Sequence, residues 1–384
     1  MRKVAIVGVG LIKWGELWEK SLRQIAAEAI FECLEDAGTD RIDAMTIGNM
    51  SGGLFNGQEH LSSLIPDFMG LKNIPAMRIE SACASGGMAV RTAYLEVASG
   101  LSDFAVAVGV EKMTDISGQE ATYALATAAD QDHEAFHGVT FPGLYAMMAK
   151  AHMDRYGTTR EDLSSVVIKN HKNGSLNPNA QFPFEITGDQ VLRSPMVADP
   201  LRLLDCSPIS DGAAAVMLTT LEEAEKLKKQ PVLISGIGHA TDSLALSSRN
   251  DILKMEAVEQ SASKALEMAG KSIEDIDFAE VHDCFSIAEI MILEALGVVP
   301  PGEGGKASSE GLTALNGKFP VNPSGGLKSK GHPVGATGVA QICEAVAQLK
   351  GEAGKRQLKN VKAGLTQNMG GSAGSSVVHI LEVI

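Results

Sequence analysis

The chain of 384 residues is acidic: 33 basic against 47 acidic side chains give it a net charge of −14. This charge disfavours nucleic acid or an anionic membrane as a partner, and an aromatic content of 4% leaves few rings for stacking on bases. A hydrophobic content of 45% with 40 glycines is typical of a tightly packed α/β enzyme, and the length predicts two domains or one large duplicated one.

The five cysteines are scattered along the chain without a C-x-x-C pair or a repeated spacing. This pattern predicts neither a disulfide framework nor a zinc ribbon, and the odd number is typical of the reducing cytoplasm. Residues 1–8 lack the long apolar region and cleavage site of a signal peptide, and no apolar run reaches the ~18 residues that span a bilayer. We therefore expect a cytoplasmic protein without a membrane segment.

The first half of the chain alternates predicted strands and helices. A strand over residues 3–10 ends in Gly-x-Gly, a helix over residues 22–37 is closed by a glycine, and a second strand follows over residues 42–48. A helix rich in small residues then begins near Cys83 and leads to a buried strand over residues 104–110.

The same order recurs in the second half. A strand over residues 231–238 again ends in Gly-x-Gly, a helix over residues 254–269 again ends at a glycine, and a strand over residues 276–282 follows. A helix that begins near His332 then leads to a strand over residues 361–366. Matches in the same order indicate a duplication, so we expect an α/β fold of two pseudo-twofold halves with mixed sheets between helices.

One long segment interrupts the first half. Residues 114–204 are polar, rich in Met and His and contain turn signals, which indicates a mostly helical loop domain folded over the active site. The first half resumes with the apolar run at residues 211–218. We therefore divide the chain into an N-terminal half, residues 1–225, which contains this insertion, and a C-terminal half, residues 226–384.

Cys83 and His332 occupy matching places at the helix starts of the two halves. A thiol at a helix N-terminus has its thiolate favoured by the helix dipole and nearby amides, and the small residues within 81–87 leave room for a substrate. Pseudo-twofold halves bring equivalent helix starts together, so we expect the thiol as nucleophile and the imidazole as its base. A small buried cysteine and a structural histidine are the alternatives.

Two further segments carry candidate groups. His282 and Cys284 lie at the end of a predicted strand, where alternation sends both to one face as an oxyanion donor and a second acid or base. A core histidine and cysteine are an equally good interpretation. Gly370 lies in the glycine-rich residues 368–374, where its N–H can complete an oxyanion hole with that of Cys83. An ordinary hairpin turn is the alternative there.

Two other patterns are weaker. His133 and His137 have the spacing of a metal pair but no third ligand signal, so we interpret them as part of a solvated loop and expect no metal. Residues 8–10 lack the third glycine and the acidic residue of a dinucleotide fingerprint, which disfavours a bound dinucleotide.

Four segments together resemble the thiolase superfamily, and the resemblance covers essentially the whole chain. They are a cysteine loop at residues 83–85, a His-Asp-Cys-Phe loop at 282–285, a Gly-His-Pro loop at 331–333 and a glycine-rich last loop at 370–371. The His-Asp-Cys-Phe form is similar to sterol-carrier-protein-type thiolases, and residues 141–145 and 320–326 are similar to archaeal acetyl-CoA C-acetyltransferases.

The resemblance implies a thiolase-like α/β/α/β/α layered fold and the reversible Claisen condensation of two acetyl-CoA to acetoacetyl-CoA, with no tightly bound cofactor. It implies that His332 activates Cys83, which forms an acyl-enzyme. Cys284 takes the role of the second catalytic cysteine that many thiolases carry in the last loop. His282 and His332 hold the enolate oxygen, and the N–H groups of Cys83 and Gly370 hold the tetrahedral oxyanion.

The resemblance also implies partners. The inserted domain grips the CoA, with Ser247 and Ser248 as secondary contacts. We expect a homo-oligomer, a dimer or tetramer, that feeds hydroxymethylglutaryl-CoA synthase in a mevalonate-type isoprenoid pathway. In archaeal relatives a small OB-fold zinc protein bridges the two enzymes. The alternatives are a degradative 3-ketoacyl-CoA thiolase, a non-catalytic acyl-CoA-binding scaffold of a multienzyme complex, and a ketoacyl synthase, which Cys284 beside His282 disfavours.

Overall fold

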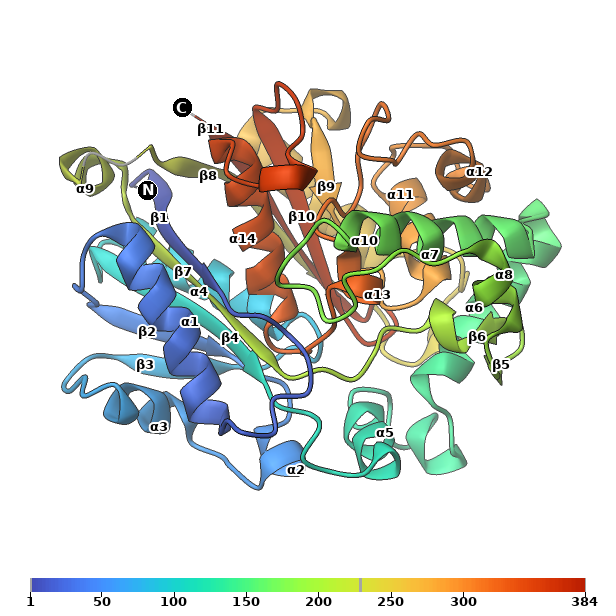
Figure 1. Ribbon diagram of the computed structural model, residues 1–384, viewed down its shortest axis with the longest axis horizontal. Helices are drawn as coiled ribbons and strands as arrows, with labels where there is room; N and C mark the ends of the chain where they lie inside the picture. Colours follow the sequence, from blue (N-terminus) through green and yellow to red (C-terminus); the bar gives the residue numbers. More distant parts are fainter. Residues whose placement is uncertain (1, 228–229, 384) are drawn as a thin grey trace.

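The computed structural model describes residues 2–227 and 230–383, and in these ranges nine strands form one sheet in the order β3-β2-β4-β7-β1-β8-β11-β10-β9 (Figure 1). The strands are β1 (Val4–Leu11), β2 (Ala44–Gly48), β3 (Ala76–Ile79), β4 (Phe104–Glu111), β7 (Gly212–Thr220), β8 (Val232–Thr241), β9 (Phe278–Glu280), β10 (Ala363–Gly370) and β11 (Ser375–Val383), with a separate pair β5 (Met196–Ala198) and β6 (Leu201–Arg202). The sheet is mixed, because β2 runs parallel to β3 and β4, and β9 parallel to β10, whereas the other neighbours are antiparallel.

The strand order shows the duplication. Outward from the centre of the sheet, β1, β7, β4 and β2 of the first half match β8, β11, β10 and β9 of the second. The halves join where β1 pairs with β8 through Ala5 with Leu233 and Ile6 with Val232. This symmetric order confirms the duplicated α/β fold that the repeated sequence pattern predicts.

Helices cover both faces of each half-sheet. They are α1 (Leu22–Ala37), α2 (Gly52–Asn56), α3 (Leu61–Phe68), α4 (Ser85–Ser99), α5 (Gly118–Ala126), α6 (Phe141–Tyr156), α7 (Arg160–Gly174), α8 (Gly188–Arg193), α9 (Leu221–Lys226), α10 (Glu256–Ala269), α11 (Ser286–Ala295), α12 (Gly304–Ser309), α13 (Gly326–Ser329) and α14 (Thr337–Lys350). Helix α1 packs on β1, β7 and β4, and α10 packs on β8 and β11. Because α4 and α14 contact each other and strands of both halves, they form the middle of the α/β/α/β/α layers.

Glycines bring the starts of α4 and α14 into contact. A Cβ atom on Gly86 would lie 2.6 Å from the carbonyl oxygen of Gly335, closer than non-bonded atoms approach. A Cβ atom on Gly335 would lie 2.7 Å from both the Glu111 carboxylate and the Gly48 carbonyl oxygen. The small residues near Cys83 and His332 therefore do more than leave room for a substrate, because they allow two helix N-termini to meet.

Strand β9 is shorter than the sequence pattern predicts. The pattern predicts a strand over residues 276–282, whereas β9 ends at Glu280. Beyond it the N–H of Val281 donates to Asn322 Oδ1 at 2.8 Å, and the N–H of His282 donates to Gln367 Oε1 at 3.2 Å. Side-chain acceptors thus replace the neighbouring strand, so His282 and Cys284 lie in a loop past the end of β9.

The inserted segment, residues 114–204, contains α5, α6, α7, α8 and the β5–β6 pair, and it occupies the right-hand side of Figure 1. Helix α7 packs on α11, α12 and α13, so the insertion is tied to the C-terminal part of the chain. Among the described residues, no helix combines the length and the apolar character needed to cross a bilayer.

Candidate active site

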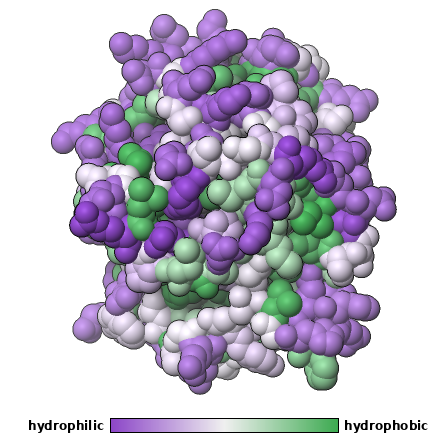
Figure 2. All heavy atoms as spheres, turned by 90° about the vertical axis from the view of Figure 1, so that its right-hand side faces the viewer, coloured by the Kyte–Doolittle hydropathy of each residue, from purple (hydrophilic) through white to green (hydrophobic). Residues whose placement is uncertain are grey.

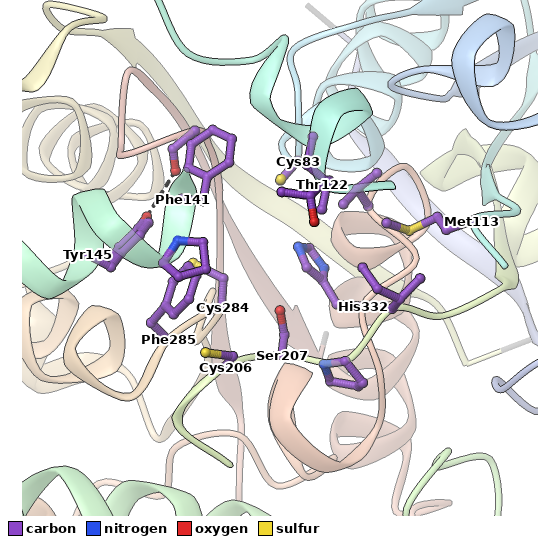
Figure 3. Close-up of a pocket in the computed structure, with 16 residues that line it drawn as sticks. Cys83, Met113, Thr122, Phe141, Tyr145, Cys206, Ser207, Cys284, Phe285 and His332 are labelled. Carbon is purple, nitrogen blue, oxygen red and sulfur yellow. Dashed lines mark hydrogen bonds between the residues drawn. The ribbon is translucent and has the colours of Figure 1, made fainter. Parts of the chain in front are cut away.

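A cavity of about 160 Å³ lies beside the N-terminal ends of α4 and α14. Cys83, Cys284 and His332 all line it, although they lie far apart in the sequence (Figure 3). Much of the remaining wall is apolar and includes the rings of Tyr145 and Phe285, which stack with centroids 4.5 Å apart. The cavity therefore combines two thiols and an imidazole with a largely apolar surface.

The candidate nucleophile meets both candidate histidines. The Cys83 sulfur and one nitrogen each from His282 and His332 lie within 4.8 Å of one another. The two imidazole rings stand edge to face, with centroids 5.0 Å apart and planes at 79°. A proton can therefore pass between thiol and imidazole after a small adjustment of either side chain.

Cys83 follows a strained turn. Ala82 has a φ of +48°, in the left-handed region, and the Ser85 hydroxyl holds the turn at 2.5 Å from the Ala82 carbonyl and 2.9 Å from the Ser81 nitrogen. Burial raises the pKa of the Cys83 thiol well above its usual range, although the N–H groups of Gly371 and of Cys83 itself lower it by hydrogen bonding. Burial thus outweighs the helix start, which favours a thiolate, and the resting sulfur is a thiol that needs a base.

His332 is held in one tautomer by α14. Thr337 Oγ1 donates its hydrogen to the Pro333 carbonyl at 3.1 Å, so it accepts the N–H of His332 Nδ1 at 2.7 Å. The ring therefore keeps a lone pair on Nε2, the nitrogen left to face Cys83. Burial lowers the pKa of His332 well below its usual value, so the imidazole is neutral and able to accept a proton.

This depressed pKa predicts the pH dependence of acylation. Because the imidazole stays neutral well below its ordinary pKa of 6.5, we expect the acetylation rate to stay level as the pH falls from about 7.5 to about 5.5. Below pH 6.5 His332 is protonated in the unfolded chain but stays neutral in the folded protein, so the free energy of unfolding decreases as the pH falls. Rapid-mixing kinetics on protein shown to be folded by circular dichroism measures the profile. A loss centred near the ordinary pKa in folded protein would contradict a neutral imidazole.

Cys284 faces the same cavity from the loop after β9. Burial raises the pKa of its thiol to about 12, while a hydrogen bond with Tyr145 and the Lys328 ammonium lower it. Lys328 is 2% exposed, and its Nζ donates to the Cys284 carbonyl at 3.1 Å and lies 5.7 Å from the centroid of the Phe285 ring. Burial outweighs both contacts, so Cys284 rests as a thiol, and the Lys328 ammonium beside it favours the thiolate that forms when the proton leaves.

The loop after β10 places Gly370 and Gly371 in different surroundings. Gly370 ends β10, where it pairs with Ser375, and it does not line the cavity. Gly371 does line it: its φ is +60°, its carbonyl accepts the Tyr145 hydroxyl at 2.9 Å, and its N–H bonds to the Cys83 sulfur. Gly371 thus presents its N–H at the Cys83 sulfur, whereas an oxyanion donor from this loop, at Gly370 or at Gly371, stays a prediction.

Other residues singled out from the sequence lie away from the cavity. Ser247 and Ser248 belong to a short 3₁₀ turn, Leu246–Ser248, where both are exposed and neither lines the cavity. A contact from this turn to the distal part of a CoA stays a prediction. His133 is exposed and bonds through Nδ1 to Asp130 at 3.0 Å.

Three residues that sequence reasoning did not single out support the site: Tyr145, Lys328 and Thr337. Tyr145 is fully buried and spans from Gly371 to Cys284. Lys328 and Lys330 are two lysines within a glycine-rich stretch, a pattern that by itself does not show that Lys328 is buried against carbonyl groups. Tyr145 carries no comparable signal because Gly371 and Cys284 are distant from it in the sequence, and Thr337 lies near His332 in the sequence but meets its ring only through the turn at the start of α14.

Comparison with known families matches nearly the whole chain. A model described as the N-terminal domain of thiolase matches residues 4–222, and one described as thiolase C-terminal domain-like matches residues 238–383. An acetyl-CoA acetyltransferase of Methanothermobacter thermautotrophicus is 54% identical over 382 residues, which cover 99% of each chain.

More distant relatives share the same architecture. The sterol carrier protein 2 of Bos taurus is 36% identical over 96% of this chain and 70% of its own length. A solved structure of an Ltp2-ChsH2(DUF35) aldolase superposes with a TM-score of 0.84 at 24% identity, over 99% of this chain and 98% of that one. At this identity the superposition shows a shared fold.

Proposed function

Because the chain belongs to the thiolase family, whose members are acyltransferases that use CoA substrates and need no tightly bound cofactor, we propose that it is an acetyl-CoA C-acetyltransferase. It condenses two acetyl-CoA molecules reversibly to acetoacetyl-CoA. The observation that carries this proposal is the meeting of the Cys83 sulfur with His282 and His332 within 4.8 Å, beside Cys284 on one small cavity. The 54% identity to an acetyl-CoA acetyltransferase supports acetyl as the transferred group.

The first half-reaction acetylates Cys83. Nε2 of His332 accepts the thiol proton as the sulfur attacks the carbonyl carbon of acetyl-CoA. The carbonyl oxygen becomes negative in the tetrahedral intermediate, where the N–H groups of Cys83 and Gly371 donate to it. The bond between that carbon and the CoA sulfur then breaks, and the imidazolium returns its proton to the departing CoA.

The second half-reaction forms the carbon–carbon bond. The thiolate of Cys284, which burial makes the minor form of this group, removes an α-proton from a second acetyl-CoA, and the resulting enolate attacks the acetyl carbon on Cys83. The bond to the Cys83 sulfur breaks, acetoacetyl-CoA leaves, and the proton held by Cys284 passes to the Cys83 sulfur. Lys328 supports the first of these steps because its ammonium lowers the pKa of the Cys284 thiol, whereas the Tyr145 hydroxyl donates its one hydrogen to the Gly371 carbonyl.

An assay in both directions tests the proposal. With acetyl-CoA alone the purified protein should form acetoacetyl-CoA, and with acetoacetyl-CoA and CoA it should release acetyl-CoA. In a thiolysis series over acyl length, acetoacetyl-CoA should react fastest, because the cavity of about 160 Å³ is walled by rings such as Tyr145 and Phe285. Faster thiolysis of long 3-ketoacyl chains would identify a degradative thiolase instead. Binding of CoA without acyl transfer would favour a non-catalytic scaffold.

Partners and compartment extend the proposal. We propose a cytoplasmic homo-oligomer that feeds hydroxymethylglutaryl-CoA synthase in a mevalonate-type pathway, with a small OB-fold zinc protein as bridge. A following enzyme that removes acetoacetyl-CoA would drive the uphill condensation, which supports coupling to a synthase. A complex with a second protein is supported by the structurally similar Ltp2-ChsH2(DUF35) aldolase, whose name gives two components. Figure 2 shows apolar patches among polar atoms on the side where the insertion lies, and the insertion exposes Phe184, Met196 and Leu203. All five cysteines are free, which supports a reducing compartment.

A further inference from the structure

Asn368 connects three segments around the site: its own strand β10, the start of α4 and the loop after β9. It lies in β10, its residue is 2% exposed, and its side chain reaches the start of α4 and the loop after β9. Its Nδ2 donates to the Cys83 carbonyl and to His282 Nδ1, each at 3.0 Å, and its Oδ1 accepts the N–H of Gly87 at 3.2 Å. One amide thus contacts the nucleophile's own residue and a candidate oxyanion donor.

The orientation of this amide is determined by its neighbours. The Gly87 N–H is a donor, so it requires the oxygen of Asn368, and the Cys83 carbonyl is an acceptor, so it requires the nitrogen. If the amide were flipped, its NH₂ group would face the Gly87 N–H and its oxygen would face the Cys83 carbonyl oxygen. The group that meets His282 is therefore the NH₂, which can donate and cannot accept.

The tautomer of His282 follows from this orientation. Nδ1 accepts the Asn368 hydrogen, so it carries no proton of its own. Burial, reinforced by the Lys328 ammonium, lowers the pKa of His282 to about 3, so the ring is neutral and holds one proton. That proton is on Nε2. His282 is therefore an N–H donor at Nε2, whereas His332 keeps a lone pair on the same ring position.

We propose that Asn368 is a positioning residue that holds His282 in the Nε2–H tautomer and so provides the N–H that stabilises the enolate oxygen of the second acetyl-CoA. The inference rests on the proposed acetyl-CoA condensation. When an α-proton leaves, negative charge develops on the thioester oxygen, and an N–H aimed at it stabilises that charge. The other tautomer would present a lone pair to the same oxygen and repel it.

Two glycines make room for this amide. A Cβ atom on Gly87 would lie 3.0 Å from Asn368 Oδ1, and a Cβ atom on Gly338 would overlap the same oxygen. Gly87 is in α4 and Gly338 in α14. The two helices of the middle layer, one from each half, therefore both leave space for the Asn368 oxygen. Such space is expected where the amide must keep one orientation.

The variant Asn368→Asp tests the proposal. Aspartate has the same shape but cannot donate from a carboxylate, so His282 must move its proton to Nδ1 to bond with it. We expect condensation to fall on the order of a hundredfold more than acetylation of Cys83 does. Nitrogen NMR of isotope-labelled histidine should show His282 protonated on Nε2 in the wild type and on Nδ1 in the variant. A His282→Gln spectrum assigns the signal.

The control is Asn177→Asp. Asn177 is 1% exposed and donates to the Ser324 carbonyl at 2.8 Å, so this variant places the same charge change at a buried amide away from the histidines. It should lose stability without altering the His282 tautomer or the ratio of condensation to acetylation. Asn368→Ala, which adds no charge, should lower the same ratio by a smaller factor.

The outcomes separate this inference from the proposed function. A wild-type protein that neither becomes acetylated nor condenses acetyl-CoA contradicts the proposed function, whereas the tautomer can still be measured. A catalytically active wild type with His282 protonated on Nδ1 overturns the role of Asn368, even where Asn368→Asp fails to fold. An unchanged ratio of condensation to acetylation in folded Asn368→Asp overturns it as well.

Discussion

Replacing Cys83 with alanine is expected to remove the acetyl adduct from the protein and to slow condensation and thiolysis on the order of 10⁵-fold. The Cys83 sulfur is the atom that bonds to the acetyl carbon, and it is the thiol placed within 4.8 Å of both imidazoles. Intact-mass spectrometry after incubation with acetyl-CoA measures the result. The wild type should gain the mass of one acetyl group, and Cys83→Ala should gain none.

Cys33→Ala provides the matched control, because Cys33 is fully buried in α1 on the outer face of the first half-sheet. This variant should keep the acetyl adduct. Calorimetric binding of CoA to Cys83→Ala shows that its site is intact. An adduct that persists without Cys83 would assign the nucleophile to another residue.

Replacing Cys284 with alanine should separate the two half-reactions. Acetylation of Cys83 depends on His332 and on the N–H groups at the sulfur, so it should continue near the wild-type rate. Condensation should fall by about 10³-fold, because the base that removes the α-proton is lost. Rapid quenching followed by mass spectrometry measures acetylation, and acetoacetyl-CoA formation measures condensation.

Cys284→Ser keeps the size of the side chain while making it a far weaker acid than a thiol. It should therefore acetylate and condense at the same rates as Cys284→Ala. That result would exclude a packing defect as the cause of the slow condensation. A serine variant that condenses at the wild-type rate would show that Cys284 does not remove the proton. Equal loss of acetylation and condensation in Cys284→Ala would likewise contradict a role confined to the second step.

The duplicated fold could be predicted from the sequence because strands, helices and their glycine ends are local patterns that recur in the same order. The pairing of Cys83 with His332 followed from that repeat, since equivalent helix starts meet across a pseudo-twofold axis. The predicted strand over residues 276–282 was two residues too long at each end; at its C-terminal end Asn322 and Gln367, which come from distant segments, supply the acceptors that stop the strand ladder.

The donor in the last loop shows a second limit. Gly370 and Gly371 are equivalent in the sequence, and both suit a tight turn. Which N–H faces Cys83 depends on where the β10–β11 pairing ends, at Gly370 with Ser375. A one-residue choice of this kind depends on register, which the two strands set together.

The sequence alone established which reactive side chains this protein has and which of them stand at helix starts or in loops, because helix starts and loops are set by neighbouring residues. The tertiary structure decided their protonation. Burial keeps the Cys83 thiol and the His332 imidazole neutral, and the bond that Thr337 accepts from His332 and the bond that Asn368 donates to His282 assign the protons of the two histidines. Thr337 is only five residues from His332, but burial of both histidines and the contact of Asn368 with His282 bring together segments far apart in the chain, so the reactive state of the site exists only once those segments are packed together.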